Sequence, residues 1–264
     1  MKPYILFHAN CPDGFGAAYS AWKKFSNDAI YIPVFHGEPL PELQVGADVY
    51  IIDFAYDRDT LIDLSQSHAI QVIDHHKTAQ EDLEGLDFAI FDMNQSGAVL
   101  AWKYFHPDTE VPLLLQYIQD EDIWNWALPQ AREVCTALQL YPMTFESWDN
   151  LSVEELKKEG KVALAFKQKQ IKKLIKRADI HNIAGYMVPV VNSPLFISEL
   201  GNELCKAYPE ASFSASYSDL KGRRKWSLRS IGEFDVSRVC KEFGGGGHRN
   251  ASGFSTSIEG ENLL

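Results

Sequence analysis

The row Asp74-His75-His76 offers one carboxylate and two imidazoles, side chains that proteins use to bind divalent metal ions. It follows Val72 and Ile73, whose β character and lack of helical spacing predict a buried strand that ends at the row. Past the end of a strand the chain turns, so both imidazoles can reach one pocket and the carboxylate can orient a ring nitrogen. We interpret the row as the hub of a metal site. A surface turn is the alternative when the row is taken alone.

Two other predicted strands also end in potential metal ligands. Residues 4–8 are typical of a buried strand that ends at His8, and the polar turn after it carries Asp13. Residues 48–54 are typical of a strand whose terminal acid is Asp53. Ligand sites of open α/β sheets collect at such strand ends, so these side chains are candidates for the same pocket. For Asp13 the alternative is that it caps the following helix.

Two further stretches contain candidate site residues. Asp120 and Asp122 follow an apolar helix face at 113–118, in a run of acids that either faces solvent or gathers at a cation. Ser96 and Gly97 stand where a helix N-terminus would present free amides, which is an arrangement suited to an anion. A helix cap explains this pair equally well.

Near the end of the chain, the glycines from Gly244 to Gly247 precede His248 and Arg249. Such a run carries a large entropic cost, and a chain keeps it where the backbone turns sharply or approaches another body closely. The imidazole and the guanidinium beside it indicate that this body is a phosphate or a base. A flexible linker is the alternative, but a linker would contain more serine.

The remaining pattern alternates strands with helices, which predicts an α/β fold with a parallel sheet and helices on both of its faces. Strands are expected at 4–8, 30–35, 48–54 and 70–73, and a short apolar piece follows at 88–91. Helices are expected at 17–25, 57–67 and 113–118. One long helix is expected at 153–178, with nine Lys or Arg residues between 157 and 177. We interpret it as a connector with a solvated basic face, and attraction of anions is the second interpretation.

Beyond this helix the sequence pattern is typical of short strands. They are expected at 186–191, 211–217 and 225–231, with a hairpin turn at 221–224 and a helix at 236–243. We therefore predict a metal-binding catalytic domain over 1–150, a helical connector over 151–184, and a smaller α/β domain with a mixed sheet over 185–264.

Composition limits the class of protein. The chain has 264 residues, of which 45% are hydrophobic and 23% charged, as in ordinary globular proteins. We find no signal-like segment and no apolar run of the ~18 residues that a membrane span needs. Four widely spaced cysteines fit a reducing compartment. The formal charge of -11 argues against binding of long duplex nucleic acid. We expect a cytoplasmic protein that does not enter membranes, and a homodimer is one assembly that we consider.

The candidate ligands share hard nitrogen or oxygen donors; they are His8, Asp13, Asp53, His75 and one of Asp120 and Asp122. They include too many carboxylates and too few thiolates for structural zinc, whereas mixed His and Asp suit Mn²⁺ or Mg²⁺. One ion would not use all of them, but two ions that share a bridging carboxylate would. Such paired ions commonly act on phosphate esters, because they activate water and clamp the attacking and leaving oxygens.

The sequence resembles the DHH phosphoesterases of the subgroup with a C-terminal DHHA1 domain. The matching stretches occur in the family's order; they are His8 to Ala18, Asp53, Asp74 to His76, Ser96 to Ala98, Asp120 to Trp124, Ser227 to Ser230 and Gly244 to Gly253. Alone, the Asp-His-His row is a weak signal. Combined with the C-terminal Gly-Gly-Gly-His motif it is a strong one.

The resemblance implies that the larger domain holds two divalent ions, Mn²⁺ as first choice and Mg²⁺ as the alternative, and faces the smaller domain across a cleft. One ion would bind His8 and Asp53, and the other Asp13, Asp53, His75 and the acid at 120 or 122. His76, beside Asp74, would lean toward the scissile phosphate. Substrate contacts are expected from Ser96, Arg229, Gly246, Gly247, His248 and Arg249.

One departure from the family pattern concerns the first ion. Many members place an aspartate two residues before the position that matches Asp13, and this chain has Cys11 there. Either the thiol binds the ion, which favours softer cations, or water replaces the carboxylate and the ion binds more weakly.

These features predict a metal-dependent phosphodiesterase that hydrolyses short single-stranded RNA, linear dinucleotides or nucleoside bisphosphates by means of a water activated by two metal ions. The first alternative is a phosphoanhydride hydrolase for polyphosphate or pyrophosphate, since the same ion pair could serve it. The second is a nucleotide-binding regulatory module with weak or no catalysis, which only the replacement at Cys11 supports.

Overall fold

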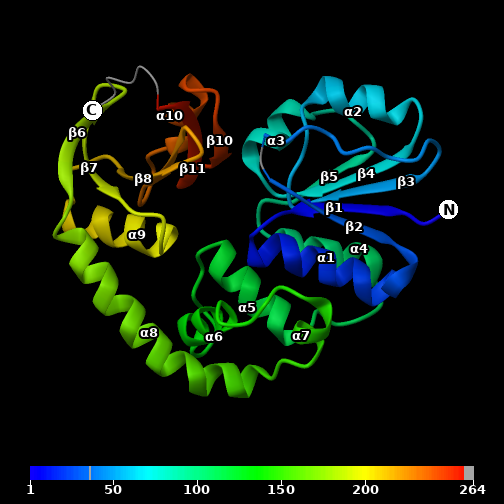
Figure 1. The fold of residues 1–264 in the computed structure, drawn as a ribbon, viewed down its shortest axis with the longest axis horizontal. Helices are drawn as coiled ribbons and strands as arrows, with labels where there is room; N and C mark the ends of the chain where they lie inside the picture. The colour runs from blue at the N-terminus through cyan, green and yellow to red at the C-terminus, as the bar shows by residue number, and fades with distance from the viewer. Residues whose placement is uncertain (36, 259–264) are drawn as a thin grey trace. The chain divides into compact units, whose positions relative to one another are not determined.

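The computed structural model describes residues 1–35 and 37–258, and the chain divides into two compact units (Figure 1). Unit 1 is Met1–Leu164 and unit 2 is Ala165–Leu264. The boundary falls inside the long helix α8 (Val153–Ile175). The finer division into a catalytic domain, a connector and a substrate domain stays a prediction.

Unit 1 contains the expected parallel sheet, with strand order β2-β1-β3-β4-β5. Its strands are β1 (Tyr4–His8), β2 (Ile30–Val34), β3 (Asp48–Ile52), β4 (Ala69–Asp74) and β5 (Ala89–Phe91). The central strands are almost continuously apolar because helices cover both faces of the sheet. In β1, for example, Ile5 and Phe7 face one hydrophobic core while Leu6 faces the other.

The helices of unit 1 lie on both faces of this sheet (Figure 1). One face carries α1 (Pro12–Phe25) and α4 (Gly97–Phe105), and α5 (Leu113–Asp122) packs against these two helices. The other carries α2 (Arg58–Ser65) and α3 (Lys77–Asp82). Close packing of α1 on α4 depends on small residues, because a Cβ at Gly16 would lie 2.8 Å from Ala98 Cβ. This packing positions the N-termini of both helices near the ends of the central strands.

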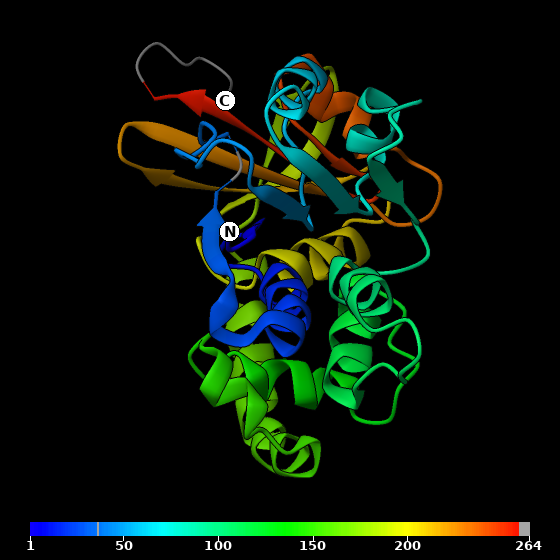
Figure 2. The same ribbon diagram turned by 90° about the vertical axis from the view of Figure 1, so that its right-hand side faces the viewer.

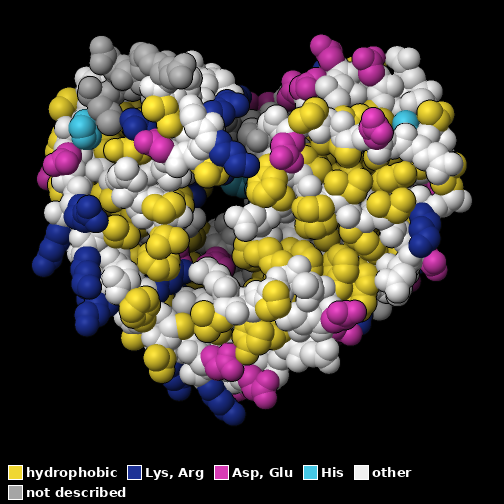
Figure 3. Space-filling model, in the orientation of Figure 1, with side chains coloured by type: hydrophobic (Ala, Val, Ile, Leu, Met, Phe, Trp, Pro, Cys, Tyr) yellow, Lys and Arg dark blue, Asp and Glu magenta, His cyan; other side chains and the backbone are white. Residues whose placement is uncertain are grey.

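The sequence pattern missed three short helices of unit 1, which are α3, α6 (Ala131–Leu138) and α7 (Phe145–Asp149). A short 3₁₀ helix at Ser26–Asp28 also follows α1. The basic residues of the long helix stand out along α8, as expected for a solvated face (Figure 3). One turn of this helix is an exception to the solvated basic face. Lys167 is buried and forms an ion pair with Glu199, while the neighbouring Phe166 is 62% exposed.

Unit 2 contains a mixed sheet, with strand order β10-β11-β9-β8-β7-β6 (Figure 2). Its elements are β6 (Asp179–Ile183), β7 (Tyr186–Asn192), α9 (Ile197–Ala207), β8 (Ser214–Leu220), β9 (Arg223–Arg229), α10 (Val236–Glu242), β10 (Gly246–His248) and β11 (Ala251–Ser257). Only β7 and β8 pair in parallel among these strands. The sequence pattern missed β6, α9, β10 and β11.

The turn between β8 and β9 confirms the expected hairpin. Lys221 and Gly222 both have left-handed backbone angles, with φ of 50° and 78°. Two consecutive positive φ values are the signature of a two-residue turn whose twist matches that of the flanking strands. Within residues 1–35 and 37–258, no helix is both long enough and apolar enough to cross a lipid bilayer.

Gly160 provides a test of how α8 packs in unit 1. A Cβ at this position would lie 2.0 Å from the carbonyl oxygen of Glu133 on α6, and a backbone atom cannot move aside as a side chain can. We expect Gly160→Ala to lower the free energy of unfolding in urea by ~1–3 kcal/mol, although alanine is the better helix former.

The matched control is Lys161→Ala, which changes an exposed residue of the same helix. We expect this variant to stay within ~0.5 kcal/mol of the wild type. Equal stability of the two variants would show that α8 does not approach α6 as closely as described.

Candidate metal centre

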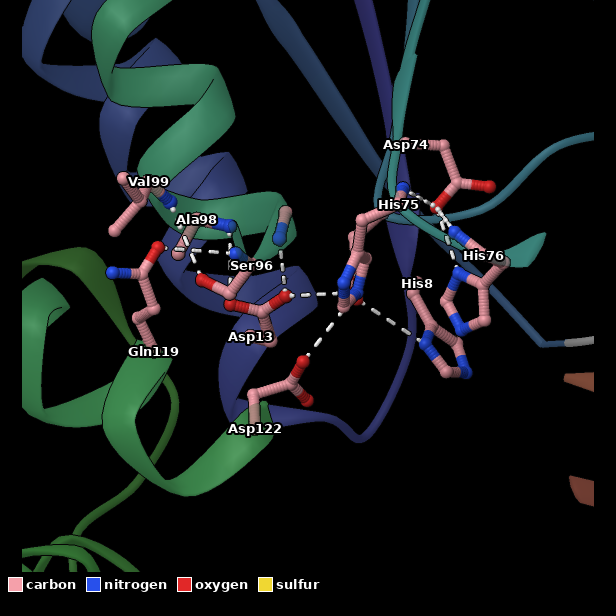
Figure 4. Close-up of polar contacts among 12 residues, drawn as sticks. His8, Asp13, Asp74, His75, His76, Ser96, Ala98, Val99, Gln119 and Asp122 are labelled. Atoms are coloured by element: carbon pink, nitrogen blue, oxygen red, sulfur yellow. Dashed lines mark hydrogen bonds and ion pairs between the residues drawn. The ribbon is translucent and has the colours of Figure 1, made fainter. Parts of the chain in front are cut away.

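The ends of three neighbouring strands bring His8, Asp53 and His75 into one cluster. Figure 4 shows the two imidazoles at these strand ends. His8 Nδ1 lies 3.3 Å from Asp53 Oδ2, and His75 Nε2 lies 3.2 Å from Asp53 Oδ1. Asp53 is only 1% exposed, so its carboxylate is held between two imidazoles inside the protein. The three residues converge because β1, β3 and β4 are adjacent and parallel, which places their carboxyl ends at one edge of the sheet.

Two more acids reach this cluster from helix ends. His75 Nε2 lies 3.6 Å from Asp13 Oδ2 and 3.4 Å from Asp122 Oδ2. Asp122 is the last residue of α5, which extends past the expected end at 118. Asp13 lies in the first turn of α1, which begins at Pro12 rather than at 17 as expected. Pro12 permits this early start because a proline suits the first helical position.

The N-terminus of α4 binds an anion, but that anion is a side chain of the protein. Asp13 accepts hydrogen bonds from the backbone amides of Gly97 at 2.6 Å and Ala98 at 3.0 Å (Figure 4). Ser96 is completely buried and caps the helix by accepting a hydrogen bond from Val99 N. The amides of the helix hold Asp13 in place, and the expected contact of Ser96 with substrate stays a prediction.

Gly97 allows α4 to approach the cluster closely. A Cβ at this position would lie 2.5 Å from Asp53 Oδ1 and 2.6 Å from Asp53 Cβ. Any other residue would therefore push α4 or Asp53 aside. The sequence pattern singled out Gly97 only as part of a helix start, and its contact with a residue 44 positions earlier in the chain (97 − 53) depends on the tertiary structure.

Asp74 organises the two histidines that follow it. Its Oδ1 accepts a hydrogen bond from His75 N at 2.7 Å and lies 2.7 Å from His76 Nδ1. Burial opposes the charged forms of both partners, but their mutual attraction outweighs it. The pKa of Asp74 is therefore lowered and the pKa of His76 is raised. Asp74 thus fixes the orientation of the His76 ring, whose side chain is 24% exposed.

The charges of the cluster are out of balance without a cation. Burial lowers the pKa of His75, but Asp53, Asp122 and Asp13 outweigh it and raise that pKa to about 11. Burial also disfavours charge on Asp53, yet its contacts with His75 and His8 hold its pKa well below the ordinary value. The other two acids, Asp13 and Asp122, are destabilised in their charged forms. Burial and the charge of Asp53 raise the pKa of Asp13 well above its ordinary value, and partial burial raises that of Asp122.

These shifts and the donor types fit a metal ion. A divalent cation among the carboxylates would supply the missing positive charge and favour their ionised forms. Asp53 Oδ1 is also buried and makes no hydrogen bond, although His75 Nε2 lies 3.2 Å away, and a cation would stabilise a buried oxygen in this state. The donors are imidazole nitrogens and carboxylate oxygens, which suit divalent cations of intermediate or hard character.

The donors form two groups, and the carboxylate of Asp53 contacts both of them. Ligand atoms of His8, Cys11 and Asp53 lie within 4.8 Å of one another, and so do those of Asp13, His75 and Asp122. Because Asp53 Oδ2 faces His8 and Oδ1 faces His75, its carboxylate lies between the two groups.

The structure favours Asp122 over Asp120 as the acid of the second group. Both carboxylate oxygens of Asp120 accept hydrogen bonds from the loop after α5, from Ala127 N and Leu128 N, each at 2.9 Å. Asp120 is 4% exposed and its oxygens are already engaged. Helical geometry explains the difference, because residues two positions apart point to different sides of α5.

In unit 2, the expected substrate residues have their own partners. Arg229 Nη2 donates to Ser198 Oγ at 3.0 Å, and Arg249 Nη2 donates to the carbonyl oxygen of Glu233 at 2.6 Å. His248 is the last residue of β10 and is partly buried. Their expected contacts with substrate stay predictions.

Two glycines of the run are explained by packing within unit 2. A Cβ at Gly245 would lie 2.1 Å from the carbonyl oxygen of Gly253, and one at Gly247 would lie 2.8 Å from that of Ala251. Gly247 also has a φ of 133°, which side chains disfavour. The sequence indicated that these glycines approach a phosphate or a base. At these two positions, the body that they approach is the neighbouring strand β11.

Comparison with known proteins places the chain in a family. No protein-family model matches it. Uncharacterized protein R106 of Acanthamoeba polyphaga mimivirus is 35% identical over 282 residues, which cover 96% of this chain and 67% of the viral protein. Oligoribonuclease NrnB of Bacillus subtilis is 24% identical over 295 residues, which cover 97% of this chain and 73% of NrnB.

The chain belongs to the DHH family of phosphoesterases. It is therefore a hydrolase that acts on phosphoester bonds, as the Asp74-His75-His76 row and the C-terminal glycine motif led us to expect. The fold agrees with that of a solved structure, RecJ in complex with Mn²⁺ from Thermus thermophilus. That structure matches with a TM-score of 0.50 and 14% identity, over 97% of this chain and 50% of RecJ.

Asp120 and Asp122 allow a test of the second donor group. We expect Asp122→Asn to weaken Mn²⁺ binding at least about tenfold with little loss of stability, because a charged ligand atom is lost. Asp120→Asn leaves a backbone amide without its acceptor, so we expect it to cost ~1–3 kcal/mol of unfolding free energy while Mn²⁺ affinity is kept.

Isothermal titration with Mn²⁺ and urea unfolding measure the two effects separately. The reverse result, loss of Mn²⁺ binding in Asp120→Asn at unchanged stability, would move the ligand to Asp120.

Proposed function

We propose that the protein is a metal-dependent phosphodiesterase that hydrolyses short oligonucleotides or linear dinucleotides to mononucleotides. The observation that carries this proposal is the buried carboxylate of Asp53 between two groups of metal ligands. A pair of cations held in this way is suited to phosphoryl chemistry. The relative NrnB is named an oligoribonuclease, which supports a short nucleic acid as substrate.

Two divalent cations, Mn²⁺ or Mg²⁺, fit the donors of unit 1. His8 and Asp53 would hold one cation, and Asp13, His75, Asp122 and Asp53 the other. When bound, such a pair polarises the phosphate and lowers the pKa of an attacking water. The protein's contribution is to fix the ligands in advance. Asp13 is held by two amides of α4, and His75 by the backbone hydrogen bond from its amide to Asp74.

His76 is the proposed hydrogen-bond donor to the scissile phosphate. Asp74 engages its Nδ1 at 2.7 Å and raises its pKa, which favours the protonated ring. A protonated ring presents Nε2–H as a donor to a phosphate oxygen, where a charge-assisted hydrogen bond stabilises developing negative charge. The partial exposure of this side chain allows contact with a substrate.

Unit 2 is proposed to bind the rest of the substrate. Arg229, His248 and Arg249 are the candidates for a second phosphate or a base, because guanidinium groups form paired hydrogen bonds with phosphate and stack on bases. The contact of Arg229 with Ser198 already limits its side-chain freedom, so less entropy is lost when a ligand binds. Gly246 and Gly247 would act through the shape of the β10–β11 turn.

Two alternatives have less support. The structure has no feature within its described residues that favours polyphosphate or pyrophosphate over a nucleotide. The hypothesis of a regulatory module without catalysis is supported only if Cys11 replaces a metal ligand without binding metal itself. Cys11, however, lies in a donor group with His8 and Asp53. We also propose a cytoplasmic location, which the four free cysteines support. Formation of a homodimer stays a prediction.

Asp53→Asn tests the proposed function. In the presence of Mn²⁺, the wild type should release mononucleotides from a linear dinucleotide, measured by anion-exchange chromatography. Loss of the buried charge between the two ligand groups should lower kcat/KM at least about 100-fold. Chelation of the metal ion should abolish product formation in the wild type.

Asp108→Asn is the matched control, because it removes an exposed carboxylate of the same unit and should leave turnover unchanged. Equal turnover by Asp53→Asn and the wild type would contradict the proposal. Faster turnover of pyrophosphate than of the dinucleotide at equal concentration would favour the phosphoanhydride alternative.

A further inference from the structure

Cys11 differs from the other three cysteines in its surroundings. Cys135, Cys205 and Cys240 are buried, whereas Cys11 is partly exposed at the end of the turn that follows β1. It occupies the N-cap position of α1, yet its side chain makes no capping hydrogen bond. The usual reasons for a cysteine, packing in a core or capping a helix, therefore do not explain this residue.

The turn holds this thiol near two metal ligands. Its Sγ belongs to the group in which ligand atoms of Cys11, His8 and Asp53 all lie within 4.8 Å of one another. Gly14 makes the approach possible, because a Cβ there would lie 2.2 Å from the carbonyl oxygen of His8. Pro12 starts α1 directly after Cys11, and a proline restricts the backbone of the residue before it, so the position of Cys11 is constrained.

The carboxylate that joins the two donor groups gives an independent indication of a bound cation. Asp53 is 1% exposed, its Oδ2 lies 3.3 Å from His8 Nδ1, and its Oδ1 makes no hydrogen bond although it lies 3.2 Å from His75 Nε2. A buried carboxylate oxygen without a hydrogen bond is rare, because burial costs it the hydrogen bonds that it makes with water. A cation beside Asp53 would remove this cost.

We propose that Cys11 Sγ is a ligand of the cation that His8 and Asp53 hold. This inference rests on the proposed function, since it concerns one of the two ions of that centre. The first ion would then have one nitrogen, one sulfur and one oxygen ligand from the protein. The second group, Asp13, His75 and Asp122, contains no sulfur.

The two ion positions consequently differ in the metal that they prefer. Thiolate ligands select softer or borderline cations, whereas carboxylates suit Mn²⁺ and Mg²⁺. The position beside Cys11 should therefore prefer Co²⁺, Zn²⁺ or Cd²⁺, and the position beside Asp122 should prefer Mn²⁺ or Mg²⁺. The centre would be a mixed one, with its first position matched to a thiophilic ion.

Titration with Co²⁺ tests this assignment without measuring activity. Coordination of a thiolate gives Co²⁺ an intense charge-transfer absorption in the near ultraviolet, which nitrogen and oxygen ligands do not give. We expect this band in the wild type and in Cys240→Ala, which changes a cysteine in the core of unit 2. We expect it to be absent from Cys11→Ser and Cys11→Asp.

Isothermal titration supplies a second readout. Cys11→Asp replaces sulfur by oxygen, so the ratio of Cd²⁺ affinity to Mn²⁺ affinity at the first position should fall at least about tenfold relative to the wild type. Circular dichroism of each variant shows whether it is folded, and the conservative Cys11→Ser variant serves if Cys11→Asp is not.

The outcomes separate this inference from the proposed function. If the wild type binds Co²⁺ without the band, or if Cys11→Ser keeps the band, the sulfur ligand is overturned. In that case, the proposal of a metal centre at Asp53 would still be supported if Asp53→Asn loses Co²⁺ binding. If the wild type binds no divalent ion, both the inference and the proposed function fail.

Discussion

A buried carboxylate between two imidazoles is the constraint on which the arrangement of unit 1 depends. Asp53 follows β3 with a left-handed backbone, at a φ of 62°, which aspartate tolerates better than most residues. A charged carboxylate inside a protein is costly unless it is paired. His8 and His75 pair with it from the two strands that flank β3, and Gly97 lets α4 close over it. The strand order, the packing of α4 and the glycine at position 97 are thus all required to pair and bury the side chain of Asp53.

The other acids of the cluster show how the fold manages like charges at close range. Asp13 is held by the N-terminus of α4, where two backbone amides and the helix dipole stabilise negative charge. The negative charge of Asp122 is stabilised by the imidazole of His75, whose Nε2 lies 3.4 Å from Asp122 Oδ2. These contacts do not balance the charges fully, as the raised pKa values of both acids show. A divalent cation would complete the balance, as the proposed metal-dependent activity requires.

Sequence reasoning and structure differ most where a distant element decides the role of a residue. The pair Ser96-Gly97 was open between an anion site and a helix cap, and the approach of Asp13 from α1 makes it the place where the protein binds its own carboxylate. The glycine run looked like a ligand loop, and part of it packs against β11 instead. Short helices such as α6 were missed because few residues carry their pattern, and tertiary packing supplies most of the stability of a short helix.

Local pattern alone determined the parallel sheet, the strand ends at His8, Asp53 and His75, and the resemblance to the DHH phosphoesterases. Such features depend on neighbours in the chain, since an apolar run sets a strand and the polar residue after it marks the strand's end. Only the tertiary structure decided that Asp122 rather than Asp120 faces His75, that Asp13 is bound by α4, and that Cys11 joins His8 and Asp53. Those outcomes depend on the side to which a helix turns and on how closely distant backbones approach, and residue spacing in one sequence does not specify either.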